Sequence, residues 1–88
     1  MLAKKQKEQV IKKFRTHDSD TGSPQVQIAI LTTEVKELTK HLKTHRKDFS
    51  SRRGLVKKVA ERRRLLKFLE REDAQAYADL IEALGLKK

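Results

Sequence analysis

The feature that most constrains the fold of this chain is a long apolar stripe with helical spacing in its first half. Its members recur in alternating steps of three and four residues, so they share one side of a single α-helix. A narrow stripe of this kind is typical of a helix that packs along a second helix. The stripe comprises Ile28, Leu31, Val35, Leu38, Leu42 and His45.

A second stripe with the same spacing supplies the expected partner helix, over about Ser50–Arg71. Only the short connection His45–Phe49 separates the two helices, and a connection of this length favours antiparallel neighbours. We therefore expect a long antiparallel helical hairpin as the frame of the fold. The second stripe comprises Leu55, Val59, Leu66 and Leu69.

Two shorter helices flank this hairpin. The first covers Lys4–Arg15, and the last begins after Asp73, a good helix cap, and ends at Gly85. Ser23 caps the second helix, and Pro24 occupies its first turn, where a missing N–H costs nothing. No run of residues alternates apolar and polar positions as a strand would. The prediction is an all-α fold of four helices, with helices 1 and 4 packed against the hairpin.

The charge of the chain indicates what it binds. Its 88 residues carry 22 basic and 12 acidic side chains, and the net charge is +10. Residues 41–71 alone hold twelve basic and three acidic residues, so the positive field is concentrated there. Such a field attracts polyanions, with nucleic acid ahead of an anionic membrane. We expect one domain over residues 1–88 with a thin core, unexported and cytoplasmic, since no signal peptide or membrane-spanning run is evident.

The third predicted helix carries the most informative group of charges. Arg53, Lys57, Arg64 and Arg71, here called the cationic rail, fall within about 40° of one another on the side opposite the apolar stripe. Phe68 lies beside them. Guanidinium groups suit phosphate oxygens, and a flat ring suits an unstacked base. Most charge runs are merely solvated, but this one has few acidic partners, which favours contact with RNA.

The first connection offers a second candidate contact. Thr21, Gly22 and Ser23 lead into a helix N-terminus, where backbone N–H groups can hold a phosphate. A plain turn with a helix cap is the structural alternative. Asp18 and Asp20 hint at a calcium loop, but Gly22 is one position early and no glutamate follows at the required spacing.

The second connection holds His41, Asp48 and Ser51, which we call the polar cluster. His41 is expected to donate a hydrogen bond beside Asp48 and Ser51, and His45 is expected either in the apolar seam or on the surface. The composition of the polar cluster is also typical of caps for the third helix. His41 and His45 have metal-like spacing, but no third ligand is evident. Since cysteine and a phosphate-binding glycine loop are both missing from the sequence, we expect no metal, no cofactor and no enzymatic activity.

Three stretches of the chain, with their spacings intact, carry a resemblance to a known family. Over these stretches and over its whole length, the chain resembles bacterial small-subunit ribosomal protein number fifteen. The stretches are Asp20-Thr21-Gly22-Ser23 with Val26-Gln27; Leu38, His41 and Leu42 with Asp48, Ser51 and Arg53-Gly54-Leu55; and Arg62-Arg63-Arg64-Leu65-Leu66 with Phe68-Leu69, Arg71, Asp73 and Tyr77.

The resemblance implies a four-helix protein that binds the central domain of 16S rRNA early in assembly of the small-subunit platform. It implies two RNA sites. The polar cluster meets a G–U/G–C element in the minor groove, where A-form RNA displays base edges. Phe68 stands where a tyrosine is common in the family, so it keeps the stacking face and lacks the hydroxyl. The other site is a three-way junction, met by Thr21, Gly22, Gln27, Arg64, Phe68 and Arg71.

The resemblance also implies partners beyond 16S rRNA. These are neighbouring small-subunit ribosomal proteins and large-subunit rRNA, at a bridge between the subunits near the second connection. Some members of the family repress their own mRNA. We expect the free protein to be a monomer that does not bind membranes.

Two other classes of function stay open at this point. A non-specific helical condenser of nucleic acid would bind with strong salt dependence but little dependence on RNA fold. A membrane-surface amphipathic protein is disfavoured, because the apolar stripe is already needed within the hairpin. RNA with a scrambled junction discriminates the first alternative, and co-sedimentation with liposomes discriminates the second.

Overall fold

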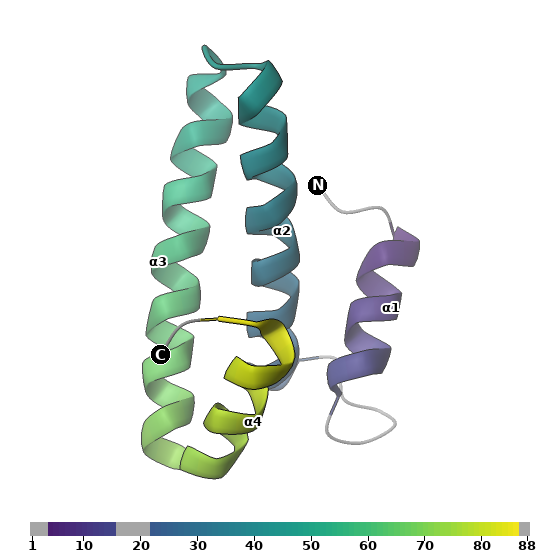
Figure 1. Ribbon diagram of the computed structural model, residues 1–88, viewed down its shortest axis with the longest axis vertical. Coiled ribbons are helices and arrows are strands. Elements are labelled where there is room, and N and C mark those ends of the chain that lie inside the picture. Colours follow the sequence, from purple (N-terminus) through teal and green to yellow (C-terminus); the bar gives the residue numbers. More distant parts are fainter. Residues whose placement is uncertain (1–3, 16–21, 87–88) are drawn as a thin grey trace.

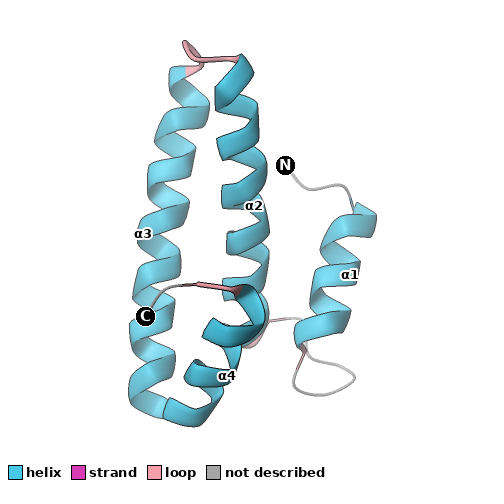
Figure 2. Ribbon diagram, in the orientation of Figure 1, coloured by secondary structure: helices cyan, strands magenta, loops and turns pink. Residues whose placement is uncertain are grey.

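The computed structural model describes residues 4–15 and 22–86, and this part of the chain is helical throughout apart from its connections (Figures 1 and 2). The all-α prediction is therefore confirmed. In chain order the helices are α1 (Lys4–Phe14), α2 (Pro24–Thr44), α3 (Phe49–Glu72) and α4 (Ala74–Leu84).

Helices α2 and α3 form the predicted antiparallel hairpin and make the most extensive contact in the structure (Figure 1). The hairpin sets the long dimension of the molecule, which measures 39 Å. An ion pair joins the two helices, with Lys58 Nζ 3.3 Å from Glu34 Oε2. Helix α1 packs on α2, and α4 folds back along α3, so both flanking helices lie against the hairpin as expected.

The core lies near the end of the hairpin that is opposite the α2–α3 connection. Ile28, Leu69 and Leu80 form its buried cluster, so α2, α3 and α4 each contribute one residue. Phe14 of α1 and Tyr77 of α4 pack against it. Because the core occupies one end of an elongated hairpin, the other end is left for surface chemistry.

Helix α2 is buried on more sides than its apolar stripe predicts. Val26 and Ala29 are fully buried although neither belongs to that stripe. Thr32 is also buried, and its hydroxyl donates to the Ile28 carbonyl at 2.8 Å. The reason is that α2 contacts α1 and α4 as well as α3, so it is the central helix of the fold.

The predicted helix ends are correct at most positions. Ser23 caps α2, with Pro24 in its first turn, and Asp73 caps α4 by accepting from Ala76 N at 3.0 Å. Helix α4 ends at Gly85, whose φ of 67° lies in the left-handed region that glycine adopts without strain. These caps fix where each helix turns back on its neighbour.

The placement of His45 in the apolar stripe is wrong. Helix α2 ends at Thr44, and the His45 backbone leaves the helical conformation (φ −124°, ψ 64°), so its side chain is exposed instead of entering the seam. Helix α3 also begins one residue earlier than expected, at Phe49. Phe49, the first residue of the helix, lies on the surface and is 59% exposed.

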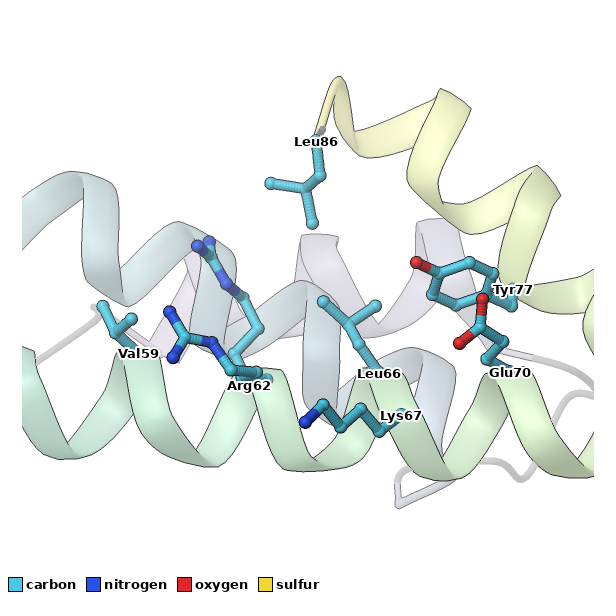
Figure 3. Close-up of a pocket in the computed structure, with 8 residues that line it drawn as sticks. Val59, Arg62, Leu66, Lys67, Glu70, Tyr77 and Leu86 are labelled. Carbon is cyan, nitrogen blue, oxygen red and sulfur yellow. The ribbon is translucent and has the colours of Figure 1, made fainter. Parts of the chain in front are cut away.

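A hollow of about 490 Å³ lies between α3 and the end of α4 (Figure 3). Leu86 points toward α3 there, and Leu66 points toward Leu86. Arg62 is half-buried, as expected of a residue on the apolar side of α3 that covers its neighbours with its aliphatic stem. This hollow lies beside the α3–α4 contact, away from the exposed rail.

Candidate nucleic-acid interface

The structure brings the polar cluster together at the connection between α2 and α3. Asp48 is the N-cap of α3: its Oδ1 accepts from Ser51 N at 3.0 Å, and its Oδ2 accepts from Ser51 Oγ at 2.7 Å. His41, in the last turn of α2, places its Nε2 2.8 Å from Asp48 Oδ2. The expected hydrogen bond from His41 is therefore confirmed, and the expected cap of the third helix is present as well.

These contacts fix the electrostatics of the cluster. Hydrogen bonds from Ser51, and then the one from His41, hold the pKa of the Asp48 carboxyl well below its usual range. A carboxylate only accepts, so His41 Nε2 and the Ser51 hydroxyl must both donate to it. The Ser51 oxygen consequently keeps its lone pairs for another donor. The cluster is half-exposed, so such a donor can reach it from outside.

A second histidine, His45, packs against the His41 side chain of the polar cluster. The His45 ring stacks on the His41 ring, with centroids 4.3 Å apart and planes 8° from parallel. Its Nδ1 lies 3.2 Å from the carbonyl oxygen of His41, at the C-terminus of α2. The two histidines with metal-like spacing are thus stacked on each other. Among residues 4–15 and 22–86, no three potential metal ligands converge.

The cationic rail lies along the exposed side of α3. Arg53, Lys57, Arg64 and Arg71 are all exposed, as the helical spacing predicts. Arg64 has one acidic neighbour, since its guanidinium forms an ion pair with Glu61 one turn earlier. This hydrogen bond raises the pKa of Arg64, which is charged in any case.

Phe68 lies among the cations at the core end of α3. The residue is 41% exposed and lines a shallow hollow of about 470 Å³ with Arg64 and Arg71. A partly exposed ring flanked by guanidinium groups can stack on a base while the cations meet phosphates. These three residues are among those that the family resemblance assigns to a three-way junction.

The residues of the first connection reach the same end of the hairpin. Gln27 Nε2 donates to the Gly22 carbonyl at 2.7 Å, and Ser23 Oγ accepts from Val26 N at 3.3 Å. Ser23 is therefore the expected cap, and Gly22 and Gln27 are exposed beside it. Thr21 lies outside the described residues, as do both aspartates of the hinted calcium loop.

The structure also exposes an apolar pair that sequence reasoning missed. Phe49 and Val56 are 59% and 64% exposed, and the Arg52 guanidinium lies 5.8 Å from the Phe49 ring centroid. Both residues fall outside the apolar stripe of α3. Their positions in the helical spacing could therefore have predicted that they are exposed. They adjoin Arg53 and Lys57 of the rail.

Fold and charge together define a class, the small basic helical proteins that bind polyanions. Within the described part of the chain, no helix is long and apolar enough to cross a membrane. Residues 6–87 match the family described as ribosomal protein S15. The chain therefore belongs to the ribosomal protein S15 family.

Individual relatives agree with this assignment over almost their whole length. The chain is 54% identical to small ribosomal subunit protein uS15 of Carboxydothermus hydrogenoformans and 53% identical to that of Lysinibacillus sphaericus. It is 53% identical to the protein of the same name from Dictyoglomus thermophilum. Each alignment spans 99% of this chain and 98% of the relative. Membership makes the chain a non-enzymatic structural component of the ribosome, in the cytoplasm.

Proposed function

We propose that this protein is a primary 16S rRNA-binding protein that recognises RNA at both ends of its helical hairpin. At the α2–α3 connection, the polar cluster reads a G–U/G–C element in a minor groove. At the core end, Gly22, Gln27, Arg64, Phe68 and Arg71 hold a three-way junction, together with Thr21.

The observation that carries this proposal is the geometry of the polar cluster. His41, Asp48 and Ser51 come from two helices and already form one hydrogen-bonded unit. Short polar groups of this kind can reach the wide minor groove of A-form RNA, where guanine presents an amino donor. The lone pairs of Ser51 Oγ are suited to accept from such a donor. The polar cluster would therefore discriminate a G–U/G–C arm from an all-Watson–Crick arm.

The rail and the exposed ring supply affinity instead. Phosphate contacts position a protein on nucleic acid, whereas base contacts specify the sequence. Ser51 and Phe68 lie roughly 25 Å apart along α3, at 1.5 Å per residue. One continuous helix thus places a discriminating site and an anchoring site on the same RNA.

The same placement supports the partners that the family resemblance implies. The protein would bind the central domain of 16S rRNA early, help to nucleate the platform, and meet neighbouring small-subunit proteins. The α2–α3 connection, at the far end from the core, would take part in a bridge to large-subunit rRNA. Repression of its own mRNA would use the same two RNA sites.

The test is the discrimination ratio, the affinity for RNA with a G–U/G–C arm divided by the affinity for RNA with an all-Watson–Crick arm. Asp48→Ala and Ser51→Ala should reduce this ratio toward one, while affinity for an isolated junction is kept. Asp73→Ala is a matched control, because it removes the equivalent cap of α4 without touching the cluster. Helicity of each variant is followed by circular dichroism.

Two outcomes would contradict the proposal. If the wild-type protein binds junction RNA and scrambled-junction RNA equally, it is a non-specific condenser. If Asp48→Ala and Asp73→Ala lower helicity to the same degree and both leave the discrimination ratio intact, the polar cluster only caps α3.

A further inference from the structure

Gly54 stands inside α3, where glycine is a poor choice for the protein alone. It lies in the second turn of a 24-residue helix and has no positive φ to justify it, since Gly85 is the sole positive-φ residue in the part of the chain that the structure describes. Inside a helix, glycine is less stable than alanine because it loses more backbone entropy on folding. The free protein therefore gains nothing from the conformational freedom of this residue.

Packing does not explain Gly54 either. A Cβ atom built at Gly54 would meet no heavy atom within 4 Å beyond its own helix backbone and immediate neighbours. Neither α2 nor any other element approaches closely enough to require a missing side chain. A methyl group at this position would lie in open space on the surface of α3.

The direction of that space is informative. At 100° per residue, Gly54 lies about 60° from Ser51 around the helix axis, on the way toward the cationic rail. Its chain neighbour Arg53 belongs to the rail, and Ser51 belongs to the polar cluster. An RNA strand that touches both groups has to cross α3 on this flank.

We propose that Gly54 is a contact point at which the sugar–phosphate backbone of RNA lies directly against the α3 backbone. The proposal rests on the function proposed above and adds a residue to it. A ribose and its phosphate lie close to the helix at this position, so that bases of the same strand reach Ser51. A side chain at position 54 would hold the RNA strand away from Ser51. The residue acts by its lack of a side chain, as glycine does at other sites of close backbone approach.

If RNA lies against Gly54, one substitution at this position should raise the stability of the protein and lower its affinity for RNA. Gly54→Ala should raise the melting temperature, because alanine favours the helix and its methyl group has room. The expected rise is about 4–8 °C, which corresponds to the usual glycine-to-alanine difference in a domain of this size. The same variant should bind RNA that carries the G–U/G–C arm at least about tenfold more weakly, which corresponds to about 1.4 kcal/mol.

The experiment compares Gly54→Ala and Gly54→Leu with wild type on two RNAs, one with the junction and arm and one with the junction alone. Affinity for the first RNA should fall further with leucine than with alanine, while affinity for the second stays within about twofold of wild type. Ala83→Gly is the control: Ala83 is exposed on α4, away from the rail and the polar cluster, so this change should lower the melting temperature and leave both affinities unchanged.

Two results would overturn the inference. Gly54→Ala with a raised melting temperature and wild-type affinity for the armed RNA would show that no RNA backbone lies there. A lowered melting temperature would show that Gly54 serves the fold itself. Failure of the proposed function is a separate result, since it appears in the wild-type protein as an equal affinity for the two kinds of arm.

Discussion

Neutralising the two rail cations that flank Phe68 should change how RNA binding depends on salt without unfolding the protein. Arg64 has 74% of its side chain exposed and Arg71 is exposed as well, so replacing both by glutamine removes little packing. Each cation that meets a phosphate releases counterions on binding. Removing two should lower the slope of log affinity against log salt by about 1.4–1.8.

That slope change gives a measurable difference. Between 50 and 200 mM salt, wild-type affinity for junction RNA should fall about 7–12 times further than that of the double variant. Filter binding or fluorescence anisotropy across four salt concentrations measures both slopes. Arg63→Gln with Lys36→Gln is the charge-matched control, because Arg63 lines the α3–α4 hollow and Lys36 lies near α1. Equal slopes for the double variant and wild type, with equal helicity, would refute the assignment of the rail to RNA.

Three further predictions concern single residues. Phe68→Ala should weaken junction binding by about 1–3 kcal/mol, the usual worth of one stacked base, with little change in melting temperature, whereas Phe49→Ala should leave junction binding intact; equal losses would contradict stacking at Phe68. Glu61→Gln frees Arg64 and removes a negative charge, so affinity for RNA should rise by up to about fivefold at low salt, and a fall would show that Glu61 orients Arg64 for binding. The ionised form of Asp48 stabilises the fold above about pH 4, the usual value in unfolded chains, and this stability is lost as pH falls through the lower folded pKa. The melting-temperature difference between wild type and Asp48→Asn should therefore narrow on acidification, and a constant difference would exclude the carboxylate as its source.

Helix identity and helix ends could be predicted because their signals are local. Ser23, Pro24, Asp73 and Gly85 act within one turn of themselves, so their roles depend on neighbours in sequence. The hairpin followed in the same way from two matching stripes and a short connection. The approach of His41 to Asp48 was also predictable, since the last turn of one helix and the cap of the next lie at the same connection.

What could not be predicted depends on contacts between distant elements. Val26 and Ala29 are fully buried because α2 contacts three helices, and one stripe on one helix does not reveal a second or third partner. His45 fits the periodicity of its helix but lies just beyond its end, so pattern alone could not exclude it from the seam. The ion pair of Arg64 with Glu61 depends on which of several side-chain rotamers each residue adopts.

The uninterrupted course of α3 from Phe49 to Glu72 has a consequence for assembly of the complex. A helix without a hinge keeps its two ends at a constant separation, so once one end is bound, the other is presented at a high effective concentration. That advantage exists only for an RNA whose two elements are spaced and rotated to match the helix. A few base pairs added between them would leave each element intact but would force the protein to bind one at a time. Under the proposed function, the hairpin therefore selects an RNA by the three-dimensional geometry of that RNA. Only an RNA that is correctly folded can engage both ends of the hairpin at once.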